Sequence, residues 1–380
     1  MRVFFYKIGL FITVFSAVYG YSQSNSPNTK SLNNSGLPPT PPIMNESEKK
    51  SMEDERSERV NQLSLRDQYF FKKSEFQSKD SKHISTSEQH QLDLIVNQVQ
   101  KTAKNSYEYH YLSYVNSNHS SSAFHHLQEA YKINPNANEL YKEFVSYYEV
   151  INNKEAKKDF LSKIKHTALY SEEQYVFAYN LLASCSEQNA VLFTYGNIDT
   201  YPTWVQQELN GKFSDVKVLN LELLLVEDYF KQLSAKYKLP KLNPVSQTAQ
   251  YIKEFAKNNP SVSVYVASTI SPSTLKDLNS SLYITGLVFK YSSQPIQNTP
   301  ILIKNWESAF NTKTLSKSAV GEDAKLKANY LIAITIIQDK YRKSGKIKEA
   351  DKTLELAKKI AKEAGVEEKY NTILRAYGQQ

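Results

Sequence analysis

The stretch that most constrains the fold is residues 175–233, where a predicted helix joins two apolar runs. The first run covers residues 190–195 and leads into a polar turn, residues 196–200. Pro202 follows at a position where the first turn of a helix tolerates proline, and the second apolar run covers residues 216–225. Two apolar runs joined by a helical crossover are typical of a parallel βαβ unit. The pattern therefore predicts a parallel sheet in the middle of the chain.

Two further apolar runs extend this sheet. Residues 262–267 form a third predicted strand, which follows a predicted helix near residues 246–258, and residues 282–291 form a last strand. Strands that alternate with helices favour a three-layer arrangement with right-handed crossovers. The sequence thus predicts a small α/β domain with a parallel sheet over residues 187–293.

Helical repeats flank this domain on both sides. Small residues at fixed spacing let paired helices approach each other closely, while Pro135 ends one pair and Gly345 lies in the turn between the helices of another, as in TPR-like hairpins. We therefore expect TPR-like helical regions over residues 61–186 and 294–380. The positions that carry the pattern are Tyr107, Tyr111, Tyr114, Ala123, Leu127, Ala130 and Pro135, a second copy from Tyr141, and Ile334, Ile337, Tyr341, Gly345, Ala350, Leu354 and Ala357.

The amino-terminal residues predict export. Residues 1–23 combine Arg2, Lys7 and an apolar run at residues 8–19, which is the pattern of a secretory signal peptide. The run is shorter than the ~20 residues that a membrane-spanning helix needs, which favours a signal peptide. An uncleaved anchor is the alternative. Residues 24–60 are rich in Ser, Asn, Pro, Glu and Lys, and they predict a disordered linker.

Several motifs in the middle of the chain resemble one family. They are AYNLLASC (residues 178–185), AVLFTYGNIDTYPTW (190–204), SDVKVLNLELL (214–224), VSVYVASTISP (262–272) and LYITGLVFK (282–290). The chain resembles the soluble α/β plus TPR-like region that follows the membrane helices of a multi-pass membrane protein family, which includes protein O-mannosyltransferases. In that family the first loop usually reads G-D-N-D-T-F-P, whereas here Asn197 replaces the first acidic residue. The transferase chemistry is expected to belong to the membrane part, so the resemblance implies a fold and a mode of partner binding without catalytic activity.

Charge and motif content argue against several other functions. The net charge of +8 is spread among interleaved acidic residues, without the basic stripe of a nucleic-acid face. The turn after the first strand has one glycine, whereas nucleotide-phosphate loops need several, so no nucleotide or other cofactor is expected. All seven histidines fall between His83 and His166, and a G-x-S-x-G elbow is lacking, which argues against a hydrolase triad. Adjacent His125 and His126 point about 100° apart on a helix, so no metal site is expected.

A candidate ligand cleft follows from the predicted topology. Sheets of this kind bind ligands at the carboxyl ends of their strands, near the point where the strand order reverses. The alternative is structural: Asp199 or Thr200 caps the helix that Pro202 enters, Ser271 or Ser273 caps the next helix, and Trp204 is a core residue rather than a stacking platform. The cleft candidates are Gly196, Asn197, Asp199, Thr200, Trp204, Ser268 and Ser271.

The expected function is that of an exported, non-catalytic interaction protein, a scaffold or accessory of the bacterial cell envelope. We expect a protein partner, including a membrane-embedded one, because helical repeats form surfaces that suit extended peptides or helices. The alternative is a carbohydrate-binding or carbohydrate-active accessory of a glycosylation system, which uses the loop Gly196–Trp204. A vestigial soluble transferase domain is a third hypothesis. The family resemblance implies the periplasm as the location, with secretion or outer-membrane association as alternatives.

Overall fold

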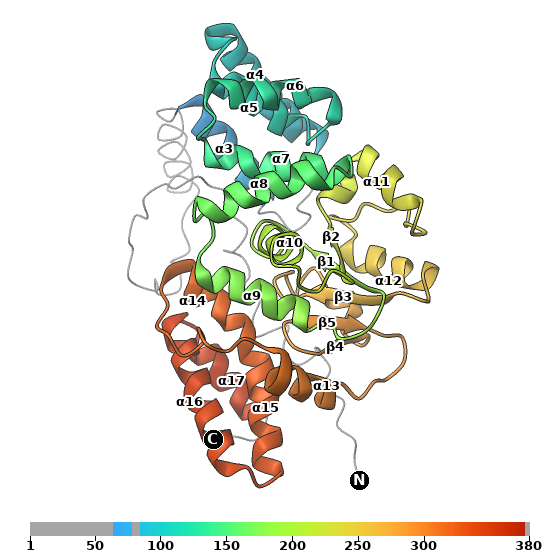
Figure 1. Ribbon diagram of the computed structural model, residues 1–380, viewed down its shortest axis with the longest axis vertical. Helices are drawn as coiled ribbons and strands as arrows, with labels where there is room; N and C mark the ends of the chain where they lie inside the picture. The colour runs from blue at the N-terminus through green and yellow to red at the C-terminus, as the bar shows by residue number, and fades with distance from the viewer. Residues whose placement is uncertain (1–63, 78–83, 377–380) are drawn as a thin grey trace, which may run out of the picture. The chain divides into compact units, whose positions relative to one another are not determined.

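The computed structural model describes residues 64–77 and 84–376, and Figure 1 shows their course. The predicted signal peptide, residues 1–23, and the predicted linker, residues 24–60, lie outside the described residues. Within the described part of the chain, no helix has both the length and the apolar character that crossing a membrane requires.

The chain divides into two compact units, and the first holds the described residues up to Leu140. Two of its helices begin at serine caps: the Ser85 side chain and Glu88 form a capping box, and the Ser106 side chain accepts from the backbone N–H of Tyr109. Tyr107 is buried, as the repeat pattern predicts. The elements are α3 (Leu65–Gln77), α4 (Thr86–Ala103), α5 (Tyr107–Asn116), the 3₁₀ turn η3 (Ser121–Ala123), α6 (Phe124–Ile133) and the start of α7 (Asn138–Val150).

The second unit runs from Tyr141 through the rest of the described chain and contains a five-stranded sheet. The fold is mixed α/β, as the sequence predicts. Its helices are the end of α7, α8 (Lys154–His166), α9 (Glu172–Ala183), α10 (Tyr201–Glu208), α11 (Glu227–Ser234), α12 (Thr248–Asn258), α13 (Asn298–Lys304), α14 (Gly321–Lys327), α15 (Leu331–Lys343), α16 (Ile347–Glu363) and α17 (Glu367–Ala376). The strands are β1 (Ala190–Thr194), β2 (Lys217–Asn220), β3 (Ser263–Ala267), β4 (Leu282–Ile284) and β5 (Val288–Tyr291).

The sheet has the order β2-β1-β3-β5-β4, and its three predicted parallel strands are parallel. Leu192 of β1 pairs with Val218 on one side and with Tyr265 on the other. Because β2 and β3 lie on opposite sides of β1, the strand order reverses beside β1. The sheet is mixed rather than wholly parallel, since β5 runs antiparallel to both β3 and β4.

The predicted last strand, residues 282–291, is in fact a tight hairpin of β4 and β5. Gly286 adopts a φ of +155° in the turn, where the backbone N–H of Thr285 donates to the carbonyl of Val288. A Cβ atom at Gly286 would lie 2.2 Å from the Ser184 hydroxyl, so only glycine fits there. The apolar run is continuous through this turn because both sides of the hairpin are buried.

Helix α12 contacts β3, and the aromatic ring of Phe193 in β1 meets the ring of Phe255 in α12 edge-on. The carboxyl-terminal helices form a hairpin in which α15 packs on α16. Gly345, with a φ of +78°, lies in the turn between them, and Ala350 and Ala357 are fully buried at the contact. These are the positions that the sequence pattern places in a turn and at a close helix contact.

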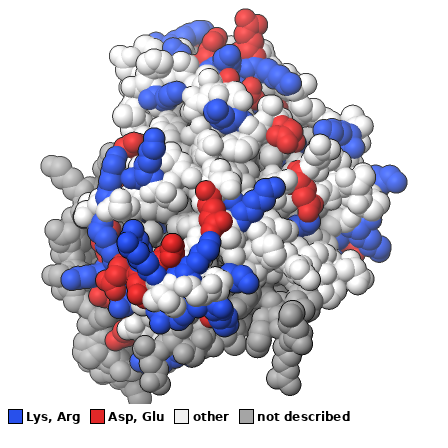
Figure 2. Space-filling model, turned by 60° about the horizontal axis from the view of Figure 1, so that its bottom comes forward, with Lys and Arg blue, Asp and Glu red and all other residues white. Residues whose placement is uncertain are grey.

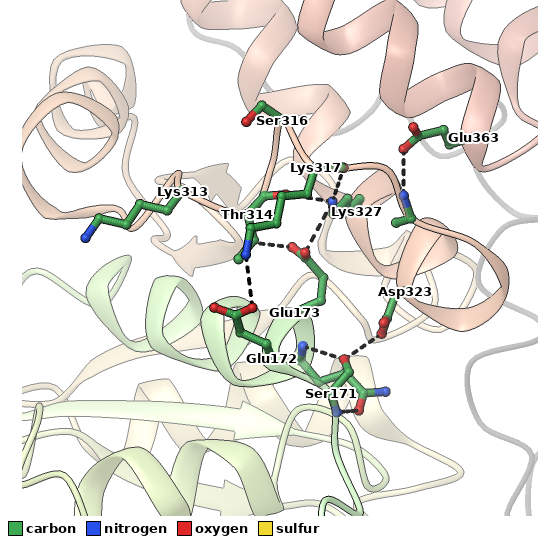
Figure 3. A network of polar contacts seen from close by, with 12 residues as sticks. Ser171, Glu172, Glu173, Lys313, Thr314, Ser316, Lys317, Asp323, Lys327 and Glu363 are labelled. Atoms are coloured by element: carbon green, nitrogen blue, oxygen red, sulfur yellow. Dashed lines mark hydrogen bonds and ion pairs between the residues drawn. The ribbon is translucent and has the colours of Figure 1, made fainter.

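A polar network joins α9 to the loop at residues 311–320 and to α14 and α16 (Figure 3). Buried Lys327 donates to the carbonyls of Thr314 and Lys317, each at 2.8 Å, and its Nζ lies 3.2 Å from Glu173 Oε2. Ser171 donates to Asp323 at 2.7 Å. The loop therefore owes its conformation to buried polar contacts as well as to apolar packing.

Candidate functional site

The predicted cleft residues lie on loops at the carboxyl ends of β1 and β3, beside the point where the strand order reverses. The loop after β1 runs into α10, and the loop after β3 leads towards the short helical turn η5 (Lys276–Leu278). Because β1 and β3 are parallel neighbours, their carboxyl ends meet at one edge of the sheet. The sequence-based placement of the site at this edge therefore agrees with the topology.

Asp199 is the centre of this cluster and is only 1% exposed. Its Oδ2 accepts hydrogen bonds from the backbone N–H of Tyr195 at 3.0 Å and from the Thr269 hydroxyl at 2.6 Å. The second bond ties the loop after β1 to the loop after β3. We call Thr194, Asp199, Thr200, Asn220 and Thr269 the strand-end cluster.

Thr200 extends the strand-end cluster to β2 and is equally buried. Its Oγ1 lies 2.8 Å from the Thr194 hydroxyl and accepts a hydrogen bond from the Asn220 amide at 2.9 Å. The Asn220 carbonyl oxygen in turn accepts from the backbone N–H groups of Glu222 and Leu223. All three parallel strands are therefore joined at their carboxyl ends by side-chain hydrogen bonds.

The predicted capping roles are wrong. Thr200 is the N-cap residue of α10, but its side chain makes no hydrogen bond to the helix, and Asp199 bonds backward to Tyr195 instead. Proline at position 202 removes one of the first-turn N–H donors, which lowers the need for a side-chain cap. The other predicted cap fails as well, because the Ser271 hydroxyl bonds to the Ser273 hydroxyl and η5 has no side-chain cap.

The remaining candidates divide by position. Gly196 and Asn197 are half-buried at the surface of the first loop, and Ser271 is half-buried in the loop after β3. Ser268 is 3% exposed, and its hydroxyl has no hydrogen-bond partner among the residues that the structure describes. It directly precedes Thr269 and so lies beside the strand-end cluster.

Trp204 does not join the other candidates. It is 2% exposed, and its ring faces the ammonium group of Lys157 at 4.3 Å. It lines a pocket with Lys217, the first residue of β2, whereas Thr200 bonds to Asn220, the last residue of that strand. Three residues of extended chain separate these points by about 10 Å. Trp204 therefore lies near the amino end of β2, whereas Asp199 lies at the carboxyl ends of the parallel strands.

Burial raises the pKa of Asp199 to about 7, although the hydrogen bonds from Thr269 and from Tyr195 lower it. Within the described residues, no Lys, Arg or His lies at ion-pair distance from this carboxyl group. The burial of this carboxyl group and its hydrogen bonds to its own loops, rather than its raised pKa, favour a structural role. The strand-end cluster therefore holds the loops after β1, β2 and β3 together, and all five of its side chains are buried.

Of this cluster, Asp199 and Thr200 are sequence candidates and Thr269 directly follows the candidate Ser268, whereas sequence reasoning missed Thr194 and Asn220. A signal for both was present, because each is a polar residue at the end of an apolar run or inside one. Figure 2 shows basic and acidic side chains interleaved on the face that it views, in keeping with the dispersed charge of the sequence.

One family of known proteins matches the chain. The sequence model of the family described as TMEM260-associated domain 2 matches residues 174–368, just over half of the chain. The match extends from α9 to the start of α17 and includes the whole sheet. No curated protein and no solved structure matches.

Proposed function

We propose that this chain, which belongs to the TMEM260-associated domain 2 family, is an exported, non-catalytic interaction protein of the bacterial cell envelope. In this proposal it acts as a scaffold or accessory and binds a protein partner, a membrane-embedded one included. The resemblance to the region behind the membrane helices of O-mannosyltransferase-like proteins is the reason for proposing a membrane-embedded partner. The periplasm is the proposed location.

The closed strand-end cluster is the observation that carries this proposal. The one carboxylate of the Gly196–Trp204 loop is Asp199, and it is buried and bonded to Thr269 and Tyr195. An enzyme of this architecture would present its reacting groups at this edge of the sheet. Their internal use instead supports a role in holding loops in place.

The helical regions support the interaction part of the proposal. The hairpin of α15 and α16 has buried alanines at its contact and a glycine in its turn, which favours a TPR-like arrangement. We propose TPR-like hairpins on both sides of the α/β region. We also propose that helices cover both faces of the sheet in three layers; the packing of Phe255 in α12 on Phe193 supports one of them.

A carbohydrate-binding or carbohydrate-active accessory of a glycosylation system is the second candidate function. The specific observation in its favour is the buried Ser268 hydroxyl, which lacks a hydrogen-bond partner within the described part of the chain and lies beside the strand-end cluster. Gly196 and Asn197 would then supply the exposed edge of the loop.

Affinity capture tests the interaction proposal. The tagged full chain, expressed in its native host, is purified from mildly solubilised envelopes, passed over a sizing column and analysed by mass spectrometry beside a tag-only bait. We expect an integral membrane protein to co-elute with the chain in a fixed ratio. A chain that elutes as a monomer without a stoichiometric partner would contradict the proposal, and glycan screening would then test the second candidate.

A further inference from the structure

A pocket with a cavity volume of about 200 Å³ opens between α7, α8, α10 and the amino end of β2. It belongs wholly to the second unit and lies away from the strand-end cluster. Its charged lining residues are Glu149, Lys154, Lys157, Glu208 and Lys217, and Trp204 lines it beside Lys157. Since ligand pockets commonly enclose about 300–1,000 Å³, this one suits a molecule no larger than a single sugar ring or amino acid.

The floor of the pocket is a buried ion pair. Glu149 Oε2 accepts from Lys157 Nζ at 2.7 Å, and the side chains are 8% and 4% exposed. Glu149 Oε1 accepts from Lys217 at 2.7 Å and from the Tyr229 hydroxyl at 3.0 Å. Although burial opposes ionisation, Lys157 and Lys217 hold the pKa of Glu149 well below its usual range. Both oxygens of Glu149 are therefore committed, and its charge is neutralised within the floor.

Polar side chains at the rim have hydrogen-bonding capacity that no described residue fills. Lys154 is exposed and makes no ion pair or side-chain hydrogen bond to any described residue. Lys217 is 33% exposed, and one of its three N–H donors bonds to Glu149. The side chains of Asn152 and Ser214, which also line the pocket, have no hydrogen-bond partner among the described residues either.

The charges of the lining sum to a positive value. Three lysines, at positions 154, 157 and 217, face two glutamates, Glu149 and Glu208, which leaves a net charge of +1. Because Lys157 and Glu149 neutralise each other, the rim presents two cations and the carboxylate of Glu208, which is 30% exposed and 3.4 Å from Lys157. Cations select an anionic group, and the carboxylate and amide groups beside them suit hydroxyls.

We propose that this pocket binds a small hydroxylated carboxylate, of the class of a single hexuronic acid. Its carboxylate pairs with Lys154 and Lys217, and its hydroxyl groups donate to Glu208 and bond to Asn152 and Ser214. The buried pair of Glu149 and Lys157 forms the floor, and the Lys157 ammonium group lies over the Trp204 ring. The site is independent of the protein partner proposed above.

Calorimetric titration of the full chain with D-glucuronate and with D-glucose tests this site. The two probes share a ring and most hydroxyls and differ in the carboxylate. We expect glucuronate to bind, glucose to bind at least tenfold more weakly, and Lys154→Gln to weaken glucuronate binding about tenfold, since one hydrogen bond to a charged group is lost.

Lys158→Gln is the matched control, because Lys158 is the exposed lysine beside Lys157 on α8 and does not line the pocket. It should bind glucuronate as the wild type does, and both exposed-lysine variants should fold. The proposal is overturned if glucuronate does not bind at about 10 mM, if glucose binds equally well, or if Lys154→Gln and Lys158→Gln bind alike. Acetate that competes as strongly as glucuronate would overturn the role of the hydroxyls.

Discussion

Replacing Lys327 with methionine is expected to lower the free energy of unfolding by about 3–5 kcal/mol, the usual cost of leaving one member of a buried ion pair alone. Lys327 is 1% exposed, lies 3.2 Å from Glu173 and donates to two backbone carbonyls of the 311–320 loop. Methionine fills the volume but leaves the Glu173 carboxylate, 9% exposed, with the Thr314 hydroxyl as its one remaining side-chain partner among the described residues. Urea unfolding, compared at constant slope, measures the loss.

Lys325→Met is the control on the same helix. Lys325 pairs with Glu322 at the surface, and such pairs contribute about 0–1 kcal/mol. Adding Glu173→Gln to Lys327→Met should recover part of the lost stability, because the buried charge then disappears. Equal midpoints for Lys327→Met and Lys325→Met would show that the network in Figure 3 does not hold the loop.

Replacing Lys157 with methionine is expected to have an effect of similar size, about 3–5 kcal/mol. This change removes the cation that lies 2.7 Å from Glu149 and over the Trp204 ring. Glu149 keeps Lys217 and Tyr229, but Lys217 is partly exposed and compensates less. The expected result is a lower urea midpoint with an unchanged slope.

Lys158→Met is the neighbouring control, since Lys158 is exposed and should tolerate the change within about 0.5 kcal/mol. The double variant with Glu149→Gln and Lys157→Met should be more stable than Lys157→Met alone, because no buried charge is left without a partner. If the double variant instead loses the sum of both single effects, the two side chains do not act as a pair.

The three parallel strands could be predicted because their residues form continuous apolar runs, which buried strands require. Predicted residues 190–195 and 262–267 differ from β1 and β3 by one residue each. The second run, residues 216–225, was too long because apolar content alone does not separate a strand from the buried 3₁₀ turn Leu223–Leu225 that follows. Apolar content also does not reveal the turn between β4 and β5, because residues 282–289 are all buried.

The candidate site could be located from topology but not resolved in detail. The carboxyl ends of parallel strands meet, so Asp199 and Ser268 were expected at one edge. The direction of each side chain depends on tertiary packing, which placed Trp204 in a pocket beside Lys157 instead. The buried lysines at positions 157 and 327 had no sequence signal, because lysine is rarely buried unless it is paired.

The most direct test of the closed strand-end cluster is the pH dependence of stability in the wild type and in Asp199→Asn. Burial raises the pKa of Asp199 from 3.8 to about 7, so between these values the folded state holds a proton that the unfolded state has lost. The stability from this proton is complete below about pH 4 and is lost as pH rises through 7. Three pKa units correspond to roughly 4 kcal/mol.

Urea unfolding at pH 4 to 8 should therefore show that the wild type loses roughly 4 kcal/mol more than Asp199→Asn as pH rises, since asparagine does not titrate. This difference is the predicted result for a carboxyl group enclosed by its own loops. Parallel curves for the two proteins would contradict it. They would mean that Asp199 is solvated with an ordinary pKa, that the loop is open, and that the main support for a non-catalytic role is lost.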